Sequence, residues 1–368
     1  MKAELTVTDG VRHIRPDIRA MQAYRLPPGP AAQAATAIRL HQNEAPEDWP
    51  EAIKREIAER LVAAPWHRYP SARADEACTA IAVMQGTDPS MVAATAGSNE
   101  ALWAVFAACA SGGTVVMPSP TYSMAKTLAV AAGAKVVEVP LGDRFALDAG
   151  AVLRAAHARR AELVYLASPN NPTGNALDRD AVLAVVGGAP GAVMVDEAYW
   201  EFASRTFLDA VDRWGHVIVV RTFSKAMGGA GLRIGWLTAQ PPVIAEMAKV
   251  IPPYSLNVFA QTAVPVLVAH RGLAAARVRT IVAERERVAR SLRALGMTVH
   301  ASETNFLLFE PGRLPADVWQ TLAERGVLVR NVSAAPRLQA CLRVSIGTPA
   351  ENDRLIAALA PDTLRGAR

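Results

Sequence analysis

Side chains able to do chemistry follow several apolar runs of the sequence, each at the point where the run ends. They are Ser98, Asn99, Tyr122, Asn171, Asp196, Tyr199, Thr222, Ser224 and Lys225, with Arg233 eight residues beyond the lysine. A lysine amine can attack a carbonyl group and form an imine. A carboxyl group such as that of Asp196 can keep a ring nitrogen protonated, and Asn171 and Tyr199 can donate hydrogen bonds to a phenolate oxygen. These residue types favour covalent chemistry on an aromatic carbonyl compound.

The same set of residues can also hold a phosphate group. Ser98 and Asn99 follow Gly97 and open a predicted helix, whose N-terminal N–H groups favour an anion. Arg233 can add a forked, charge-assisted contact, and Tyr122 offers a flat face to an aromatic ring. A Schiff-base lysine with an acidic partner for a pyridinium nitrogen is what pyridoxal phosphate requires. Taken together, the residues predict a site for pyridoxal 5'-phosphate.

Each of these residues, taken alone, has a simpler structural interpretation. A lysine after a strand is usually a solvated surface residue, and Asp196 could cap a helix. The stretch 170–174 (NNPTG) could be only a turn, and Tyr122 could pack in the core. The joint order of the residues, each at a strand end, favours the cofactor site.

The elements that must position these residues alternate along the chain from about residue 90. Short β-rich apolar runs separated by helical segments predict βαβ units and a mostly parallel sheet, covered by helices on both faces, in the α/β class. Ligands of such sheets bind at the carboxyl ends of the strands. The predicted strands are 92–95, 114–117, 135–139, 162–167, 192–196 and 217–222, and the predicted helices are 100–110, 122–132, 147–159 and 178–186.

A change of pattern marks a second, smaller α+β domain. Two proline pairs, at 241–242 and 252–253, bracket a helix and mark the exit from the first domain. We predict an N-terminal arm at 1–45, a large domain at 46–252, and a C-terminal domain at 253–368 that part of the arm completes. The last domain is predicted to hold a charged helix at 277–295 and strands at 304–310, 327–331 and 342–346.

Composition excludes several classes of protein. The 368 residues are 51% hydrophobic and carry a net charge of +5, which is typical of a globular chain of about two to three domains. Basic residues are interleaved with acidic ones and form no nucleic-acid motif, although a basic pocket for a small anion stays open. Three cysteines without C-x-x-C and the absence of H-x-x-x-H argue against disulfides and a metal site. The uncharged stretch 101–125 is broken by glycine and proline, so we predict a cytoplasmic protein without a membrane span.

At the strand-end residues that predict the cofactor site, the chain resembles the fold-type I pyridoxal-phosphate-dependent aminotransferases, and most closely the histidinol-phosphate aminotransferase family. The resemblance extends from about Val11 to Leu359. The chain departs from the family at Ala45, where asparagine is usual, and at Asn99, where aspartate is common. The segments that carry the resemblance are 14–24, 43–46, 68–70, 120–122, 168–174, 195–199, 221–226, 231–235 and 342–348.

The resemblance implies a role for each cofactor-site residue. Lys225 would hold the cofactor covalently and later move a proton, while Asp196 would keep the pyridine nitrogen protonated. Tyr199 and Asn171 would bond the ring oxygen, and Tyr122 would stack on the ring. The residues around the cofactor phosphate would be Ser98, Asn99, Thr222, Ser224 and Arg233, together with Tyr69 from the neighbouring subunit of a homodimer with two shared sites.

The resemblance also implies a substrate. Arg343 would receive the substrate carboxylate, Arg330 would help it to hold a substrate phosphate, and Tyr24 on the arm would close over the substrate. Two forked guanidinium groups can serve a phosphate and a carboxylate in turn. The implied reaction is transamination between L-histidinol phosphate and 2-oxoglutarate, in histidine biosynthesis.

Other functions stay open or are less favoured. An aromatic amino-acid aminotransferase and a threonine-phosphate decarboxylase share most of these residues. The S-x-x-K match at 123–126 has no K-T-G or S-D-N beside it, and we interpret it as the start of a helix. The glycines at 229, 231 and 235 fit a dinucleotide fingerprint poorly. A pyridoxal-phosphate-binding regulator would need a DNA-binding domain, for which about 45 residues before the core leave little room.

Overall fold

The computed structural model describes residues 11–23, 37–203 and 205–360. Within these residues, the largest sheet has seven strands in the order β2-β8-β7-β6-β5-β3-β4. Strands β3 to β7 run parallel, and β8 lies antiparallel between β2 and β7. The predicted mostly parallel sheet is confirmed. Its strands are β2 (Val92–Thr95), β3 (Thr114–Ser119), β4 (Lys135–Pro140), β5 (Leu163–Ala167), β6 (Ala192–Asp196), β7 (Val217–Thr222) and β8 (Gly235–Thr238).

Helices cover both faces of this sheet because successive strand residues point to opposite sides. Val115 and Val116 of β3 are both fully buried, but they belong to different core clusters. One cluster includes helices α4 (Ser98–Ala110), α5 (Ser123–Ala131) and α9 (Pro241–Val250). The other includes α6 (Ala149–Arg159), α7 (Arg179–Gly188) and α8 (Leu208–Arg213). The four helices predicted here are present, with ends that differ by no more than two residues from those expected.

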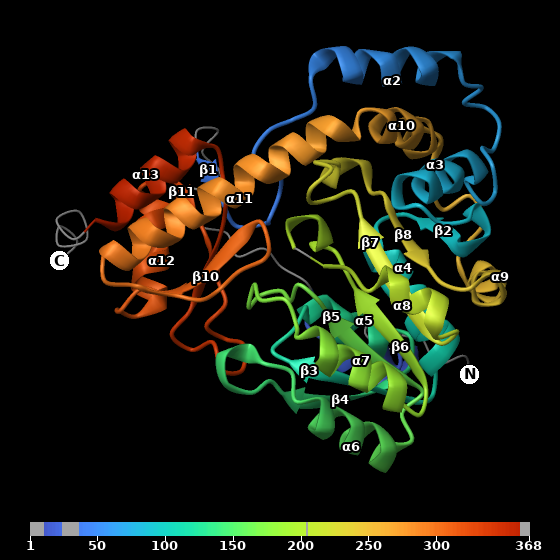
Figure 1. Ribbon diagram of the computed structural model, residues 1–368, viewed down its shortest axis with the longest axis horizontal. Coiled ribbons are helices and arrows are strands. Elements are labelled where there is room, and N and C mark those ends of the chain that lie inside the picture. The colour runs from blue at the N-terminus through green and yellow to red at the C-terminus, as the bar shows by residue number, and fades with distance from the viewer. Residues whose placement is uncertain (1–10, 24–36, 204, 361–368) are drawn as a thin grey trace, which may run out of the picture.

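A third group of helices packs beside β2 and β8. It consists of α2 (Glu51–Ala63), α3 (Asp75–Gln85) and α10 (Val258–Ala269). Helix α11 (Arg271–Ala294) then runs from α10 to the C-terminal part of the molecule (Figure 1). It begins earlier than the helix predicted at 277–295, because Ala274 is buried against this third group. The domain boundary predicted after residue 252 stays a prediction, and the packing of α10 on α2 and α3 favours a later one.

The C-terminal part is built on an antiparallel sheet which, in the described chain, has four strands in the order β12-β13-β10-β9. The prediction of a single strand at 327–331 is wrong. The structure has two short strands there, because the two halves pair with different partners. Residues 327–328 form β11, which pairs in parallel with β1 (Ile38–Arg39), whereas residues 330–331 form β12, which pairs with β13. The bounds are β9 (Thr298–Val299), β10 (Phe306–Glu310), β11 (Val327–Leu328), β12 (Arg330–Asn331), β13 (Leu342–Ser345), α12 (Pro315–Glu324) and α13 (Pro349–Leu359), with α1 (Pro16–Ala20) near the start of the chain.

No single described helix is long and apolar enough to cross a membrane, although α10 and α11, bent by 73° where they meet, together satisfy the criterion of length and composition.

Candidate active site

The strand-end residues lie at one edge of the seven-stranded sheet. Strands β2, β3, β5, β6 and β7 all end there, and β8 begins there because it runs in the opposite direction. Ser98 starts α4 just after β2, Asn171 follows β5, and Lys225 follows β7. The topology therefore places the candidate residues where ligands of such sheets bind.

Asp196 is a buried carboxyl group at the end of β6. Its Oδ2 accepts a hydrogen bond of 2.9 Å from the hydroxyl of Tyr165, and its Oδ1 accepts one of 3.1 Å from the backbone N–H of Ala198. Burial raises the pKa of the Asp196 carboxyl to about 6, although both hydrogen bonds oppose the shift. A cation placed next to this carboxyl would favour its ionised form, so Asp196 suits a protonated ring nitrogen.

Lys225 lies three residues beyond the end of β7, with its amine close to Tyr199. Its Nζ donates to the carbonyl of Gln42 at 3.2 Å and lies 5.8 Å from the centre of the Tyr199 ring. Burial, and next the positive charge of Arg343, lower the pKa of the Lys225 amine to about 8. A buried amine with a lowered pKa is what a Schiff-base lysine needs.

The residues expected around a phosphate also meet. The hydroxyl of Thr222 donates to Ser224 Oγ at 2.9 Å, and Arg233 Nη1 donates to the same Ser224 oxygen at 3.5 Å. Across the cluster, the Tyr122 hydroxyl donates to Asn99 Oδ1 at 3.1 Å. The first two contacts hold Thr222, Ser224 and Arg233 together in the connection between β7 and β8, and the third joins the start of α4 to the segment before α5.

Two glycines allow this group to pack closely. Gly97 has φ +83°, and a Cβ there would lie 2.4 Å from Arg233 Nη2. A Cβ at Gly235 would lie 2.3 Å from the backbone nitrogen of Ser98. The start of β8, the N-terminus of α4 and the Arg233 guanidinium therefore form a cradle that has room only for glycine at these positions. Its backbone amides, hydroxyls and guanidinium fit a phosphate group.

Arg330 and Arg343 are direct partners on the antiparallel strands β12 and β13. Side chains of directly opposed residues lie on the same face of a sheet. Arg343 Nη1 donates to Asn171 Oδ1 at 2.6 Å, so this face meets the end of β5. Two guanidinium groups thus lie beside the predicted cofactor site. We call Arg330 and Arg343 the two-arginine pocket.

Two predicted residues lie away from this cluster. Tyr69, between α2 and α3, is 81% exposed, and its ring stacks on that of Tyr254 with 4.5 Å between the ring centres. Its predicted contact across a subunit boundary stays a prediction. Tyr24 lies outside the described residues.

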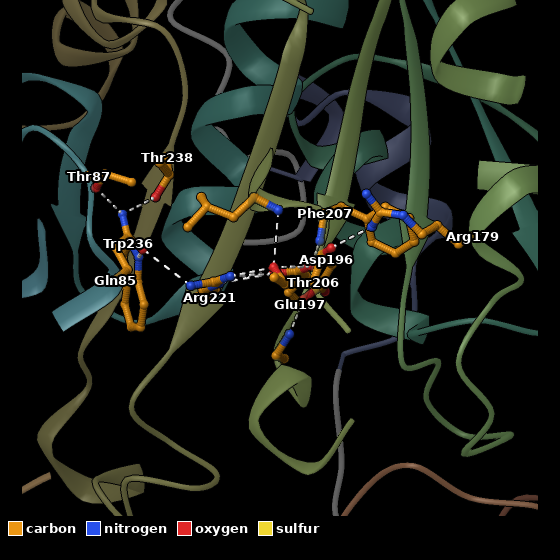
Figure 2. A network of polar contacts seen from close by, with 12 residues as sticks. Gln85, Thr87, Arg179, Asp196, Glu197, Thr206, Phe207, Arg221, Trp236 and Thr238 are labelled. Carbon is orange, nitrogen blue, oxygen red and sulfur yellow. Dashed lines mark hydrogen bonds and ion pairs between the residues drawn. The ribbon is translucent and has the colours of Figure 1, made fainter. Parts of the chain in front are cut away.

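A buried ion pair next to the site was not predicted from the sequence. Arg221, on β7, donates from Nε and Nη2 to Glu197 Oε2 at 3.0 and 2.8 Å, and both side chains are only 1% exposed. Figure 2 shows the pair joined to Thr206 on one side and Gln85 on the other. The network ties the ends of β6 and β7 together. An arginine inside the apolar run 217–222 indicates a buried partner, but not which one.

The segment after β1 also contributes more than its sequence indicated. The amide of Asn43 donates to the Tyr199 hydroxyl at 2.9 Å, and the carbonyl of Gln42 accepts from Lys225. Asn43 was noted only as part of a resembling segment, because nothing local shows that residues 41–43 reach a strand end more than 150 residues further along the chain.

The expectation that the chain has no metal site stays a prediction. Among the described residues, one group of possible ligands consists of His300, Glu310 and Cys341, whose ligand atoms lie within 4.8 Å of one another. The contact of 3.1 Å between His300 Nε2 and Glu310 Oε1 is also an ordinary hydrogen bond.

Comparisons with known proteins agree with the arrangement of the site. The family model described as aminotransferase class I and II matches residues 35–359. A histidinol-phosphate aminotransferase from Chlorobaculum tepidum is 36% identical over 349 residues, which are 94% of this chain and 99% of that protein. One from Thermococcus kodakarensis is 38% identical over 346 residues, covering 94% and 97%. The solved structure of histidinol-phosphate aminotransferase from Sinorhizobium meliloti, in complex with pyridoxal-5'-phosphate, has a TM-score of 0.85 at 26% identity and covers 96% of this chain and 98% of that chain.

Proposed function

Because the chain belongs to the class I and II aminotransferases, we propose that it transfers an amino group between L-histidinol phosphate and 2-oxoglutarate, with pyridoxal 5'-phosphate as its cofactor. The products are imidazole acetol phosphate and L-glutamate, and the pathway is histidine biosynthesis. The relatives named as histidinol-phosphate aminotransferases support this substrate, since the chain matches them over nearly their whole length.

The residues at the sheet edge have the properties that the cofactor requires. When bound, pyridoxal phosphate supplies an aromatic ring that withdraws electrons from the substrate carbon. Lys225 attaches the cofactor and, once released from it, accepts and returns the proton of the substrate carbon. Asp196 holds the proton on the ring nitrogen. The remaining cofactor contacts come from Ser98, Asn99, Tyr122, Asn171, Tyr199, Thr222, Ser224 and Arg233.

The observation that carries the substrate assignment is the pairing of Arg330 with Arg343. A phosphate dianion and a carboxylate must bind in turn beside the same reactive amine. Two guanidinium groups on one face of the sheet can bind either anion, because each offers a planar fork of N–H donors. An aromatic amino acid carries a carboxylate with a single charge in place of the phosphate dianion, so Arg343 alone suffices for it and Arg330 is not needed.

We also propose that the active form is a cytoplasmic homodimer with two shared sites. The hydroxyl of Tyr69 is directed to the cofactor phosphate of the neighbouring subunit. Tyr254, which stacks on Tyr69 and is 41% exposed, and Trp66, three residues before Tyr69 in the sequence and 68% exposed, support an interface on this surface.

The substrate assignment is tested with Arg330→Ala. Losing one charged contact costs about 1.5–3 kcal/mol, so kcat/KM for L-histidinol phosphate should fall about 10- to 100-fold. The value for L-phenylalanine should change by less than about threefold. Arg354→Ala, an exposed arginine on α13, is the matched control and should change neither value. Equal losses on both substrates, or a faster wild-type reaction with L-phenylalanine, would favour an aromatic aminotransferase instead.

A further inference from the structure

His41 lies beside the two-arginine pocket, on the segment that leaves β1. Its carbonyl oxygen accepts a hydrogen bond of 2.9 Å from Arg343 Nη2. The next carbonyl, of Gln42, accepts from Lys225 Nζ at 3.2 Å. The backbone at His41 therefore runs between the reactive amine and the pocket. The positive charges of both Arg330 and Arg343 act on the pKa of the His41 imidazole, so the ring lies near the two guanidinium groups.

The imidazole is half-buried and has an unused polar atom. Its Nδ1 is inaccessible to water and has no hydrogen-bond partner among the described residues. A buried polar atom left without a partner costs free energy, and a bound anion cannot reach Nδ1 because it has no accessible surface. No other side-chain nitrogen or oxygen of the segment 41–44 is left in this state within the described chain, so Nε2 is the ring nitrogen of His41 that water or an anion can reach.

The charges that act on this imidazole come from four elements packed around it. Burial is the largest influence and lowers the pKa of His41 below its usual value; Arg39 of β1, Arg330 of β12 and Arg343 of β13 lower it further, while Glu44 of the following loop raises it. The ring is therefore neutral at pH 7 when the pocket holds no anion. A dianion between the guanidinium groups would cancel their repulsion of a proton on the ring.

We propose that His41 is a third anion-binding residue of the two-arginine pocket, and that its imidazole takes up one proton from solvent when a dianion binds there. The proposal rests on the proposed function, in which the dianion is the substrate phosphate. The protonated ring then offers an N–H donor to the phosphate in addition to the guanidinium groups. A carboxylate carries one charge fewer and draws the proton less strongly, so His41 favours the phosphate substrate over the dicarboxylate partner.

The direction in which dianion affinity changes with pH follows from this proton uptake by His41. Binding of the dianion raises the pKa of His41, so the added affinity is fully present below the pKa of the free pocket. It is lost as the pH rises through the higher pKa of the complex. Dianion affinity should fall by up to about tenfold per pH unit in this window.

Inorganic sulfate is the probe, because it stays dianionic from about pH 4 upward and so supplies no proton of its own. The cofactor-loaded protein is titrated with sulfate in a calorimeter at pH 7, in two buffers of different ionisation heat, which gives the number of protons taken up. His41→Asn keeps a polar side chain but cannot titrate. The matched control is His157→Asn on α6, whose ring contacts only the carbonyl of Gly188 at 2.9 Å among its described hydrogen bonds.

The wild-type protein and His157→Asn should take up a substantial fraction of one proton per site. His41→Asn should take up none, and its sulfate affinity should be weaker at pH 6 and nearly independent of pH. Sulfate binding without proton uptake, or equal uptake in His41→Asn, would overturn the role of His41 while leaving the pocket intact. Sulfate binding that does not weaken in Arg330→Ala, or no binding at all, would overturn the pocket itself and with it the phosphate substrate.

Discussion

The burial of Lys225 determines how much of its amine can react at neutral pH. With a pKa of about 8, about one amine in ten is unprotonated at pH 7. An exposed lysine with the ordinary value of 10.5 would have about one in three thousand. The pKa of the Asp196 carboxyl, at the end of the adjacent strand β6, is shifted in the opposite direction by the same cause, because burial disfavours the charged form of both groups. Burial thus leaves part of the Lys225 amine unprotonated and, at the same time, raises the proton affinity of the Asp196 carboxyl.

The effect of the Arg343 charge on the pKa of Lys225 can be separated from the effect of burial by mutation. In the cofactor-free protein, Arg343→Gln removes a positive charge near the Lys225 amine, so the pKa of Lys225 should rise from about 8. The measurement is the pH profile of acetylation of Lys225, quantified by mass spectrometry. At pH 7 the variant should be acetylated several-fold more slowly, while Lys135 on the surface of β4 should react equally in both proteins. An unchanged Lys225 profile would show that the charge of Arg343 does not contribute to the lowered pKa of Lys225.

At the scale of elements, the phosphate end of the site depends on how closely β8 approaches α4. Gly235 begins β8, and an added Cβ would meet the backbone of Gly97 and Ser98 at 2.4 and 2.3 Å. Backbone atoms cannot move aside as a flexible side chain does. A larger residue at position 235 must therefore push the helix N-terminus away from the loop that carries Lys225.

Gly235→Ala should weaken cofactor binding without removing any cofactor contact. Displacing one helix N-terminus from an anion costs about 1–2 kcal/mol, so the dissociation constant of pyridoxal phosphate should rise about 5- to 30-fold. The constant is measured by absorbance titration of the cofactor-free protein. Gly231→Ala is the matched control, because nothing lies within 4 Å of a Cβ at that position. If both variants bind the cofactor as tightly as the wild-type protein, the close approach of β8 does not matter to the site.

The elements that the sequence predicts well are those specified locally. Strands β6 and β7 have the predicted bounds, because each begins with four apolar residues and is buried on both faces. The break at Val329 could not be predicted, because it depends on β1, almost 290 residues earlier in the chain. In the same way, the order of strand ends predicts the position of Lys225 and Asp196. The contact of Asn43 with Tyr199 and the orientation of His41 depend on long-range packing that no local pattern records.

At the scale of the whole molecule, a single chain leaves one of its predicted cofactor-binding residues, Tyr69, exposed on the surface. The Tyr69 ring is 81% exposed, although the resemblance assigns its hydroxyl to a cofactor phosphate. It lies in the connection between α2 and α3, whereas Lys225 lies at the end of β7. Its exposure fits the proposal that Tyr69 serves the site of another copy of the chain. Catalysis would then require association, and dilution to monomers would abolish it.

Combining one inactive and one impaired variant should restore activity if the sites are shared. Lys225→Ala removes the reactive amine, and Tyr69→Phe removes the hydroxyl directed to the phosphate. In a heterodimer of these chains, one site combines the intact Lys225 of one chain with the intact Tyr69 of the other, and the second site carries both defects. Purified heterodimers should therefore reach about half the wild-type transaminase rate, whereas each variant alone stays far below it, with Lys225→Ala having none. If Tyr69 acts within its own chain, each site of the heterodimer carries one defect and the rate stays at or below that of Tyr69→Phe. Differently tagged chains, refolded together and isolated on both tags, distinguish the two arrangements.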